Sequence, residues 1–333
     1  MKVVGVSEVK NEIDIVEAFV RHNCESVDLL MVSDNGSTDG TLELLEKLRA
    51  TGSRIAVFSE PSFGLRQSVR ANSMMRSAIM DFGADWVVPL DADEFIEPLI
   101  DAPLREVLEG VPEEPFLVLW NNFAWTTRDS GAASPNPVDR IVARVPPNPS
   151  RAFSKIVVPA KAGLARGVAL TQGSHSLIKD GEALPAAIRD EFALCHFPIR
   201  SIGQFASKVA TGYLRYLAED TGTGGGYHYI EPFRALADNP TNIAALMENI
   251  SLRFGFNADE APNAAPIVAP LRYRGGPLEF AAPDVDAMAN ILRLSEELAL
   301  RCASLRREIA ARDRASLATR ARDLVGRLLR PRI

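Results

Sequence analysis

The first ninety residues alternate between short apolar runs and helical patterns, and this alternation limits the possible folds more than any other feature. The apolar runs lie at residues 3–6, 29–32, 55–58 and 86–90. Between them, apolar residues recur at the three- and four-residue spacing of amphipathic helices. Strands that alternate with helices form a mostly parallel sheet with helices on both faces. We therefore predict an α/β fold.

Local signals give the details of this pattern. Asn11 is predicted to cap the first helix, and Ser37 or Thr38 is predicted to cap the second. Pro89 lies inside the fourth apolar run and lacks the N–H of a normal strand residue. Pairing on one side of that strand should therefore stop early.

Acidic side chains crowd the end of the fourth apolar run, where residues 91–95 read Asp-Ala-Asp-Glu-Phe. Carboxylates this close at the end of a buried strand repel one another unless a cation lies between them. Oxygen ligands of this kind suit Mg²⁺ or Mn²⁺, and such a metal often completes its shell with substrate phosphates. The cluster predicts a metal-assisted enzyme that acts on a diphosphate.

Polar residues also follow two other strands of the predicted sheet, namely Ser7 with Glu8 and Asp34 with Asn35. Ligands of open α/β sheets bind beyond the carboxyl ends of the strands. We therefore expect these two segments and the acidic cluster to converge on one crevice.

Two arginines lie one turn apart on the helix predicted over residues 65–80. Arg66 and Arg70 are either bidentate contacts for a diphosphate or plain surface charges. Their position after the third strand places them next to the predicted crevice.

Composition and charge exclude several classes of protein. The net charge is −6, which argues against general nucleic-acid binding by the body of the chain. The three cysteines are far apart and form no CxxC pair, so we expect neither disulfides nor a zinc site and predict a cytoplasmic protein. No GxGxxG follows the first strand and no GxxxxGK[ST] occurs, which argues against dinucleotide-binding and P-loop enzymes.

The last fifty residues, 284–333, predict one long helix with an uneven charge. An apolar heptad seam would either pair two copies as a homodimer or pack on the body. Residues 301–333 hold ten arginines and three acidic residues. The end of this segment, residues 312–333, is typical of a basic amphipathic helix that contacts an anionic membrane surface, here the inner face of the plasma membrane.

Three motifs together resemble the family 2 glycosyltransferases of the GT-A fold. They are residues 6–12, the Val-Ser-Asp-Asn-Gly-Ser-Thr-Asp-Gly-Thr stretch at 32–41, and the acidic cluster. Residues 155–159, 173–175 and 196–201 are similar to the family 2-like branch, and the resemblance ends near residue 215. It implies a Rossmann-like sheet and transfer of a sugar, with inversion, from a UDP- or GDP-sugar to a glycan or glycolipid acceptor.

The resemblance also implies a division of the chain and of the site. Residues 1–115 would bind the nucleotide-sugar, 116–235 the acceptor, and 236–283 would connect to the terminal helix. The predicted donor-binding residues are Ser7, Glu8, Asp34, Asn35, Arg66, Arg70 and Asp91. The predicted ligands of Mn²⁺ or Mg²⁺ are Asp91, Asp93 and His175. The sequence also allows His175 to be a surface or core histidine.

A sugar transfer also needs a carboxylate that activates the acceptor hydroxyl. The candidates for this general base are Glu94, Asp190 and Glu191. Two other classes stay open. One is an aspartyl-type phosphatase, which also uses Asp-x-Asp after a strand; the other is a non-catalytic protein that binds sugar nucleotides or acts as a scaffold.

Overall fold

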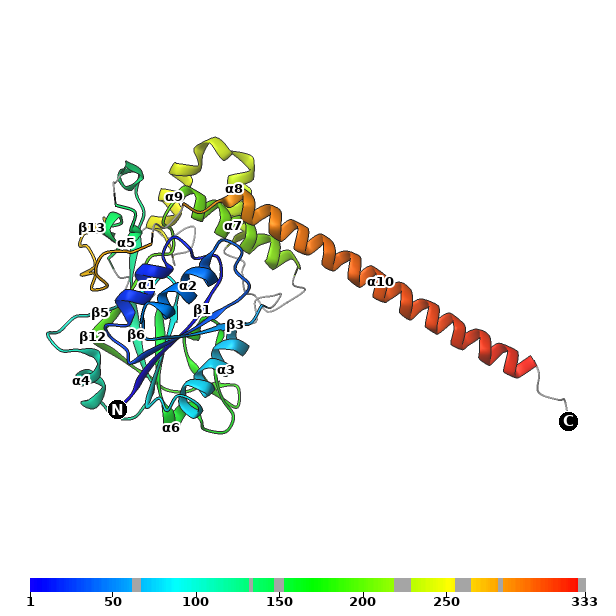
Figure 1. Ribbon diagram of the computed structural model, residues 1–333, viewed down its shortest axis with the longest axis horizontal. Helices are drawn as coiled ribbons and strands as arrows, with labels where there is room; N and C mark the ends of the chain where they lie inside the picture. The colour runs from blue at the N-terminus through cyan, green and yellow to red at the C-terminus, as the bar shows by residue number, and fades with distance from the viewer. Residues whose placement is uncertain are drawn as a thin grey trace. The chain divides into compact units, whose positions relative to one another are not determined.

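The computed structural model describes residues 1–61, 67–131, 134–146, 153–218, 229–254, 265–280 and 284–328. The chain forms two compact units, Met1–Ala287 and Met288–Ile333. The first unit is an α/β domain, and the described part of the second belongs to a long helix (Figure 1).

The N-terminal half of the first unit follows the predicted alternation. Its strands run parallel in the order β4-β1-β2-β3, with bounds β1 Val3–Val9, β2 Leu29–Asp34, β3 Ile55–Ser59 and β4 Trp86–Asp91. The helices between them are α1 Val16–Asn23, α2 Thr41–Ala50 and α3 Gln67–Met80. The predicted α/β class is confirmed.

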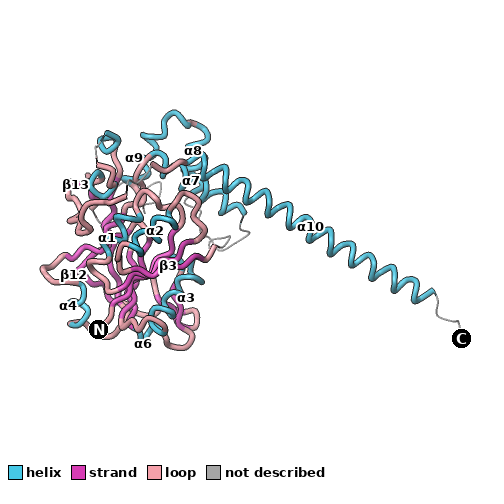
Figure 2. The backbone as a smooth tube through the Cα atoms, viewed as in Figure 1, coloured by secondary structure: helices cyan, strands magenta, loops and turns pink. Residues whose placement is uncertain are grey.

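Both faces of this parallel sheet are covered by helices (Figure 2). Val3 and Val88 pack into one hydrophobic cluster with residues of α1 and α2, whereas Val4 and Val87 pack into a second cluster with residues of α3. Successive side chains of a strand point to opposite faces. Both faces of these strands are buried, and this explains why their residues are apolar throughout.

The predicted helix caps are wrong, and side-chain hydrogen bonds explain why. The helix α1 begins at Val16 instead of directly after Asn11, because the Asn11 Oδ1 accepts the Thr38 N–H at 2.8 Å. The Ser37 Oγ in turn accepts the Asn11 N–H at 2.9 Å, and α2 begins only at Thr41. The polar residues that looked like caps link two loops at the carboxyl edge of the sheet.

Pro89 acts as predicted. On one side, β4 pairs with β1 along the whole strand, up to Asp91. On the other side, its pairing with β8, Ser154–Pro159, involves only Trp86 and Val87. The edge of β4 beside the acidic cluster therefore makes its contacts through side chains.

The C-terminal half of the first unit extends the sheet with short and mainly antiparallel strands. They are β5 Glu94–Pro98, β6 Phe116–Ala124, β7 Ala143–Arg144, β8, β12 Ala187–His196 and β13 Ile267–Val268. A separate small sheet contains β9 Val168–Leu170, β10 Leu177–Lys179 and β11 Glu182–Ala183. The strand β12 pairs with both β5 and β6, so its last residue, His196, lies opposite Glu94 of the acidic cluster.

The remaining helices of the first unit are α4 Leu104–Glu109, α5 Pro137–Arg140, α6 Ala160–Gly163, α7 Ile202–Ala218, α8 Ile230–Asp238 and α9 Ile243–Leu252. Short 3₁₀ turns occur at Thr127–Gly131, Gln172–Ser174 and Pro240–Asn242.

The predicted terminal helix is confirmed as α10, Ala287–Leu328. Among the helices that the structure describes, none is both long enough and apolar enough to cross a membrane.

Candidate active site

The backbone register brings the predicted polar strand ends together. Glu8 of β1 lies opposite Ser33 of β2 and Asp91 of β4, and Val9 lies opposite Asp34. The expected convergence of three segments at the carboxyl edge is confirmed. Their side chains separate into three groups with different partners.

The first group is centred on the Glu8 carboxylate. Arg70 of α3 binds it with both ends of its guanidinium fork, with Nε 2.7 Å from Oε2 and Nη2 against Oε1. Asn35 Nδ2 donates to the same Oε1 at 3.0 Å. Three predicted donor-binding residues therefore hold one another in place. Arg66, another predicted donor-binding residue, lies outside the described residues.

Asp34 and Ser7 lie at the same strand ends and are buried. One carboxylate oxygen of Asp34 accepts the Ser37 N–H at 3.0 Å, which fixes the turn after β2. Within the described part of the chain, the other oxygen and the Ser7 hydroxyl have no hydrogen-bond partner. Such atoms are rare in native proteins, so this edge is more polar than the fold itself requires.

Lys155 of β8 organises the second group. Its Nζ lies 2.7 Å from Asp91 Oδ2 and 3.4 Å from Glu94 Oε1. Glu94 Oε2 accepts the Asp91 N–H at 2.9 Å. The Asp91 side chain keeps 32% of its surface exposed, whereas Lys155 and Glu94 are buried.

Glu94 was one of the predicted bases, and its surroundings argue against that role. Burial raises the pKa of Glu94 well above its usual range, although Lys155 opposes the rise. The residue is 0% exposed, and a general base must reach the hydroxyl that it activates. Glu94 therefore supports Asp91 from inside the protein.

The Asp93 carboxylate belongs to a third group and is surrounded by basic side chains. Lys208 Nζ lies 3.1 Å from Oδ2, His196 Nε2 lies 3.5 Å from Oδ1, and Arg200 Nη1 lies 3.6 Å from Oδ2. Burial raises the pKa of Asp93, but these three neighbours outweigh it, and the pKa lies well below its usual range. Asp93 is therefore an ionised carboxylate neutralised by the protein itself.

Arg200 links this third group to the segment after β1. Its guanidinium is fully buried, forms two hydrogen bonds of 2.7 and 2.9 Å with Asp14, and also contacts Glu12. Burial raises the pKa of Glu12 to about 7; Arg200 lowers it, and the nearby Asp93 and Asp14 raise it further. Burial, with a smaller contribution from the two neighbouring carboxylates, therefore makes Glu12 retain its proton more readily than an ordinary glutamate.

The three predicted metal ligands do not meet at one point. Asp91 contacts Lys155, Asp93 faces its basic neighbours, and His175 Nδ1 lies 2.7 Å from Ser154 O. Among the residues that the structure describes, no three acidic, histidine or cysteine side chains form a group able to hold a metal ion. The half-exposed Asp91 carboxylate suits an ion that arrives with a diphosphate, as Mg²⁺ commonly does. The residues present therefore fit a metal at Asp91 and not at Asp93.

Asp190 and Glu191, the other predicted bases, lie in the middle of β12, six and five residues before His196. The Glu191 carbonyl accepts the Leu99 N–H beyond the end of β5, while His196 lies beside Glu94. The distance along the strand is roughly 17 Å. The structure thus separates both residues from the acidic cluster.

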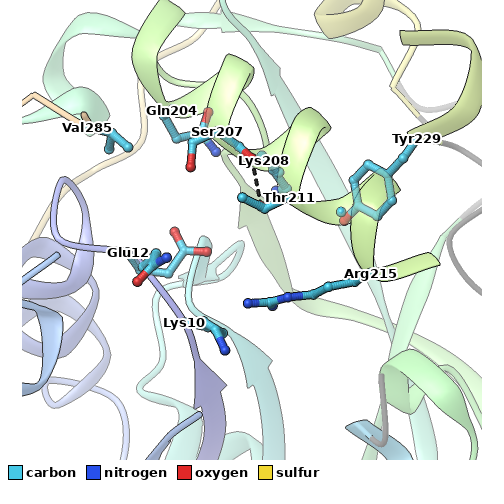
Figure 3. Close-up of a pocket in the computed structure, with 11 residues that line it drawn as sticks. Lys10, Glu12, Gln204, Ser207, Lys208, Thr211, Arg215, Tyr229 and Val285 are labelled. Atoms are coloured by element: carbon cyan, nitrogen blue, oxygen red, sulfur yellow. Dashed lines mark hydrogen bonds between the residues drawn. The ribbon is translucent and has the colours of Figure 1, made fainter. Parts of the chain in front are cut away.

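A polar pocket of about 150 Å³ opens beside the third group. Lys10 and Glu12, directly after β1, form one side, and Lys208 and Arg215 of α7 contribute to the other (Figure 3). Tyr229, just before α8, also lines it. The pocket therefore contains hydrogen-bond donors and acceptors, and side chains of both positive and negative charge.

Sequence reasoning did not predict the contacts that Glu12, Lys155 and Lys208 make. Lys208 and Asp93 are 115 positions apart in the chain, and no local pattern connects two such residues. Glu12 did carry a signal, because it follows β1 much as Asp34 and Asn35 follow β2.

No model of a protein family matches the chain, and no curated protein matches it. Solved structures do. The mannosyltransferase PcManGT from Pyrobaculum calidifontis, solved with GDP-Man and Mn²⁺, is 15% identical with a TM-score of 0.37, over 75% of this chain and 72% of its own. GalNAc-T7, solved with UDP, GalNAc and Mn²⁺, is 15% identical with a TM-score of 0.38, over 75% of this chain and 54% of its own.

The mannosyltransferase Ktr4p from S. cerevisiae is 11% identical, with a TM-score of 0.23, over 38% of this chain and 41% of its own. The likeness is remote and concerns the fold, and the ligands named in these structures belong to those proteins.

Proposed function

We propose that the chain is a glycosyltransferase that takes a sugar from a nucleotide-diphosphate donor and moves it to a glycan or glycolipid acceptor. One observation supports this most strongly. Glu8, Asp34 and Asp91 come from three adjacent parallel strands and meet at one carboxyl edge. This is where open α/β sheets bind nucleotides.

In this proposal, the nucleoside of a UDP- or GDP-sugar lies along the first group. Glu8, Asn35 and Arg70 are already fixed by their mutual hydrogen bonds. Groups that are held before the ligand arrives lose little entropy on binding. Ser7 and Asp34 add polar atoms at the same strand ends.

The diphosphate would lie near Asp91, and the metal is proposed to be Mn²⁺ or Mg²⁺ bound by Asp91 and the phosphates. When bound, such an ion neutralises the charge that develops on the leaving diphosphate. The buried Lys155 fixes the Asp91 carboxylate through its 2.7 Å contact. Glu94 fixes the Asp91 backbone through the 2.9 Å hydrogen bond to its N–H.

The polar pocket is proposed to receive the acceptor, with Glu12 as the general base. Glu12 lines the pocket, in contrast to the buried Glu94 and the distant Asp190 and Glu191. Its pKa of about 7, caused mainly by burial, suits a group that takes a proton near neutral pH. It would hold that proton at its carboxylate while the acceptor oxygen attacks the sugar.

Nucleotide binding measured by calorimetry tests the proposal. UDP or GDP should bind the wild type in the presence of Mn²⁺, and Asp91→Asn should weaken that binding by about tenfold or more, or about 1.4 kcal/mol. Glu12→Gln should keep the nucleotide affinity and reduce sugar transfer by about 10²- to 10⁴-fold.

Asp190→Asn is the matched control, because it removes an equivalent charge in the middle of β12, away from the acidic cluster. It should change neither quantity. The proposal fails if neither nucleotide binds, or if Asp91→Asn binds as well as the wild type. Rapid hydrolysis of para-nitrophenyl phosphate by the wild type would instead favour the phosphatase.

A further inference from the structure

The surroundings of Asp93 differ from those of a metal ligand. Its side chain is only 7% exposed, against 32% for Asp91. Lys208, Arg200 and His196 all lie within 3.6 Å of its oxygens. A divalent cation placed there would be repelled by at least two permanent positive charges, and repulsion between like charges is strong in a buried site.

The contacts of Lys208 show what Asp93 does instead. Lys208 Nζ binds Asp93 Oδ2 at 3.1 Å and donates to Pro198 O at 3.0 Å. These two contacts fix the position of the ammonium group. Lys208 lines the polar pocket, whereas Asp93 does not (Figure 3). Asp93 therefore contacts a pocket-lining side chain, the lysine that it holds.

We infer that Asp93 is a positioning residue that fixes Lys208 in the pocket wall and is not a metal ligand. Asp91 is then left as the acidic contact for a metal that arrives with the donor. Lys208 keeps a charged group next to Glu12, on the side where the acceptor is proposed to bind. The part of this inference that concerns the metal rests on the proposed function, and the part that concerns Lys208 does not.

Thermal unfolding of the nucleotide-free and metal-free protein tests the Lys208 part. Asp93→Asn should lower the midpoint by about 5 °C or more, because it removes the carboxylate that Lys208 binds and one of the three carboxylates around buried Arg200. Lys208→Met should also lower the midpoint, whereas Lys208→Arg, which keeps the positive charge, should have a midpoint close to that of the wild type. The double variant Asp93→Asn/Lys208→Met should lose clearly less than the sum of the two single losses, because the pair is coupled.

A metal ligand would behave in the opposite way. Removing one carboxylate from a crowded acidic site relieves repulsion, so Asp93→Asn would then be as stable as the wild type or more stable. Lys208→Met would have no stability cost in that case. Either result overturns the inference.

Mn²⁺ binding in the presence of UDP or GDP tests the metal part, through the effect of the ion on water proton relaxation at a temperature where every variant is folded. Asp93→Asn should keep the wild-type Mn²⁺ affinity within about twofold, while Asp91→Asn should lose about tenfold or more. A loss in Asp93→Asn equal to that in Asp91→Asn overturns the inference. If the wild type binds no nucleotide, the proposed function fails and the unfolding experiment alone decides the role of Asp93.

Discussion

The burial of His22 makes the stability of the fold depend on pH. Its ring is fully buried, with Nε2 2.9 Å from Ile96 O and Nδ1 accepting the Arg274 N–H at 3.2 Å. Both nitrogens are therefore satisfied by the neutral ring. Burial lowers the pKa of His22 to about 4, whereas an unfolded histidine titrates near its ordinary value.

This difference predicts a loss of stability in acid. Between about pH 6.5 and 4, the unfolded chain takes up a proton at His22 and the folded chain does not, so folding weakens as the pH falls. Above pH 6.5, the free energy of unfolding is higher by about 3 kcal/mol than it is below pH 4 because of this one group. Urea unfolding of wild type and His22→Gln at pH 7 and pH 4.5 should show a smaller acid loss in the variant. Equal losses would mean that other groups cause the acid sensitivity.

Single residues also show where prediction from sequence ends. Asp91 and Asp93 are recognisable because they are crowded at the end of an apolar strand. Their different fates are not, because Lys155 and Lys208 come from strands and helices far away in the chain. Both were predicted as metal ligands, but the Asp91 side chain is 32% exposed whereas the Asp93 side chain is 7% exposed and faces basic side chains.

At the scale of elements, the first turn of α7 depends on a glycine. A Cβ at Gly203 would lie 2.2 Å from the backbone oxygen of Val285, closer than two such atoms can approach. Ser201 Oγ also donates to Asp284 Oδ1 at 3.0 Å. The segment before α10 therefore passes directly over the start of α7, and Val285 lines the polar pocket from there.

Gly203→Ala should displace this segment and lower the free energy of unfolding by about 1–3 kcal/mol. Gly110→Ala is the matched control, because its Cβ would meet only ordinary contacts of 3.6 Å at the end of α4. Chemical unfolding of both variants measures the difference. Equal stability of the two would show that the segment adjusts without cost.

Elements differ in how far the sequence predicts them. The strands β1 to β4 are long apolar runs between helices, so periodicity identifies them. Strands such as β7, β11 and β13 have two residues each, too few for any alternation to appear. Caps failed for a related reason, since Asn11 and Ser37 form hydrogen bonds across two loops that only the folded sheet brings together.

At the scale of the whole molecule, charge is divided between a negative body and a positive tail. Residues 301–333 contribute ten arginines and three acidic residues to a chain whose net charge is −6. Basic helices with an apolar side bind anionic membrane surfaces through both features. We propose that the tail provides reversible contact with such a surface, where glycolipid acceptors are found.

Flotation with vesicles tests this. The full chain should float with vesicles that contain an anionic lipid, and a chain ending at residue 311 should not. Neutral vesicles should bind neither protein, and added salt should release the full chain because screening weakens the attraction. Equal flotation of the two chains would assign membrane binding to another part of the molecule or to none.

The position of Arg200 late in the chain affects the order in which the protein folds. Its partner Asp14 precedes it by 186 positions, and Glu12 and Asp93 also come earlier in the chain. During synthesis, these acids leave the ribosome well before the guanidinium that compensates them. The early strands can pair, but they cannot enclose their acidic edge until residue 200 has emerged, and contacts this distant in the chain form slowly. Completion of this acidic edge is therefore expected to be a late event in folding.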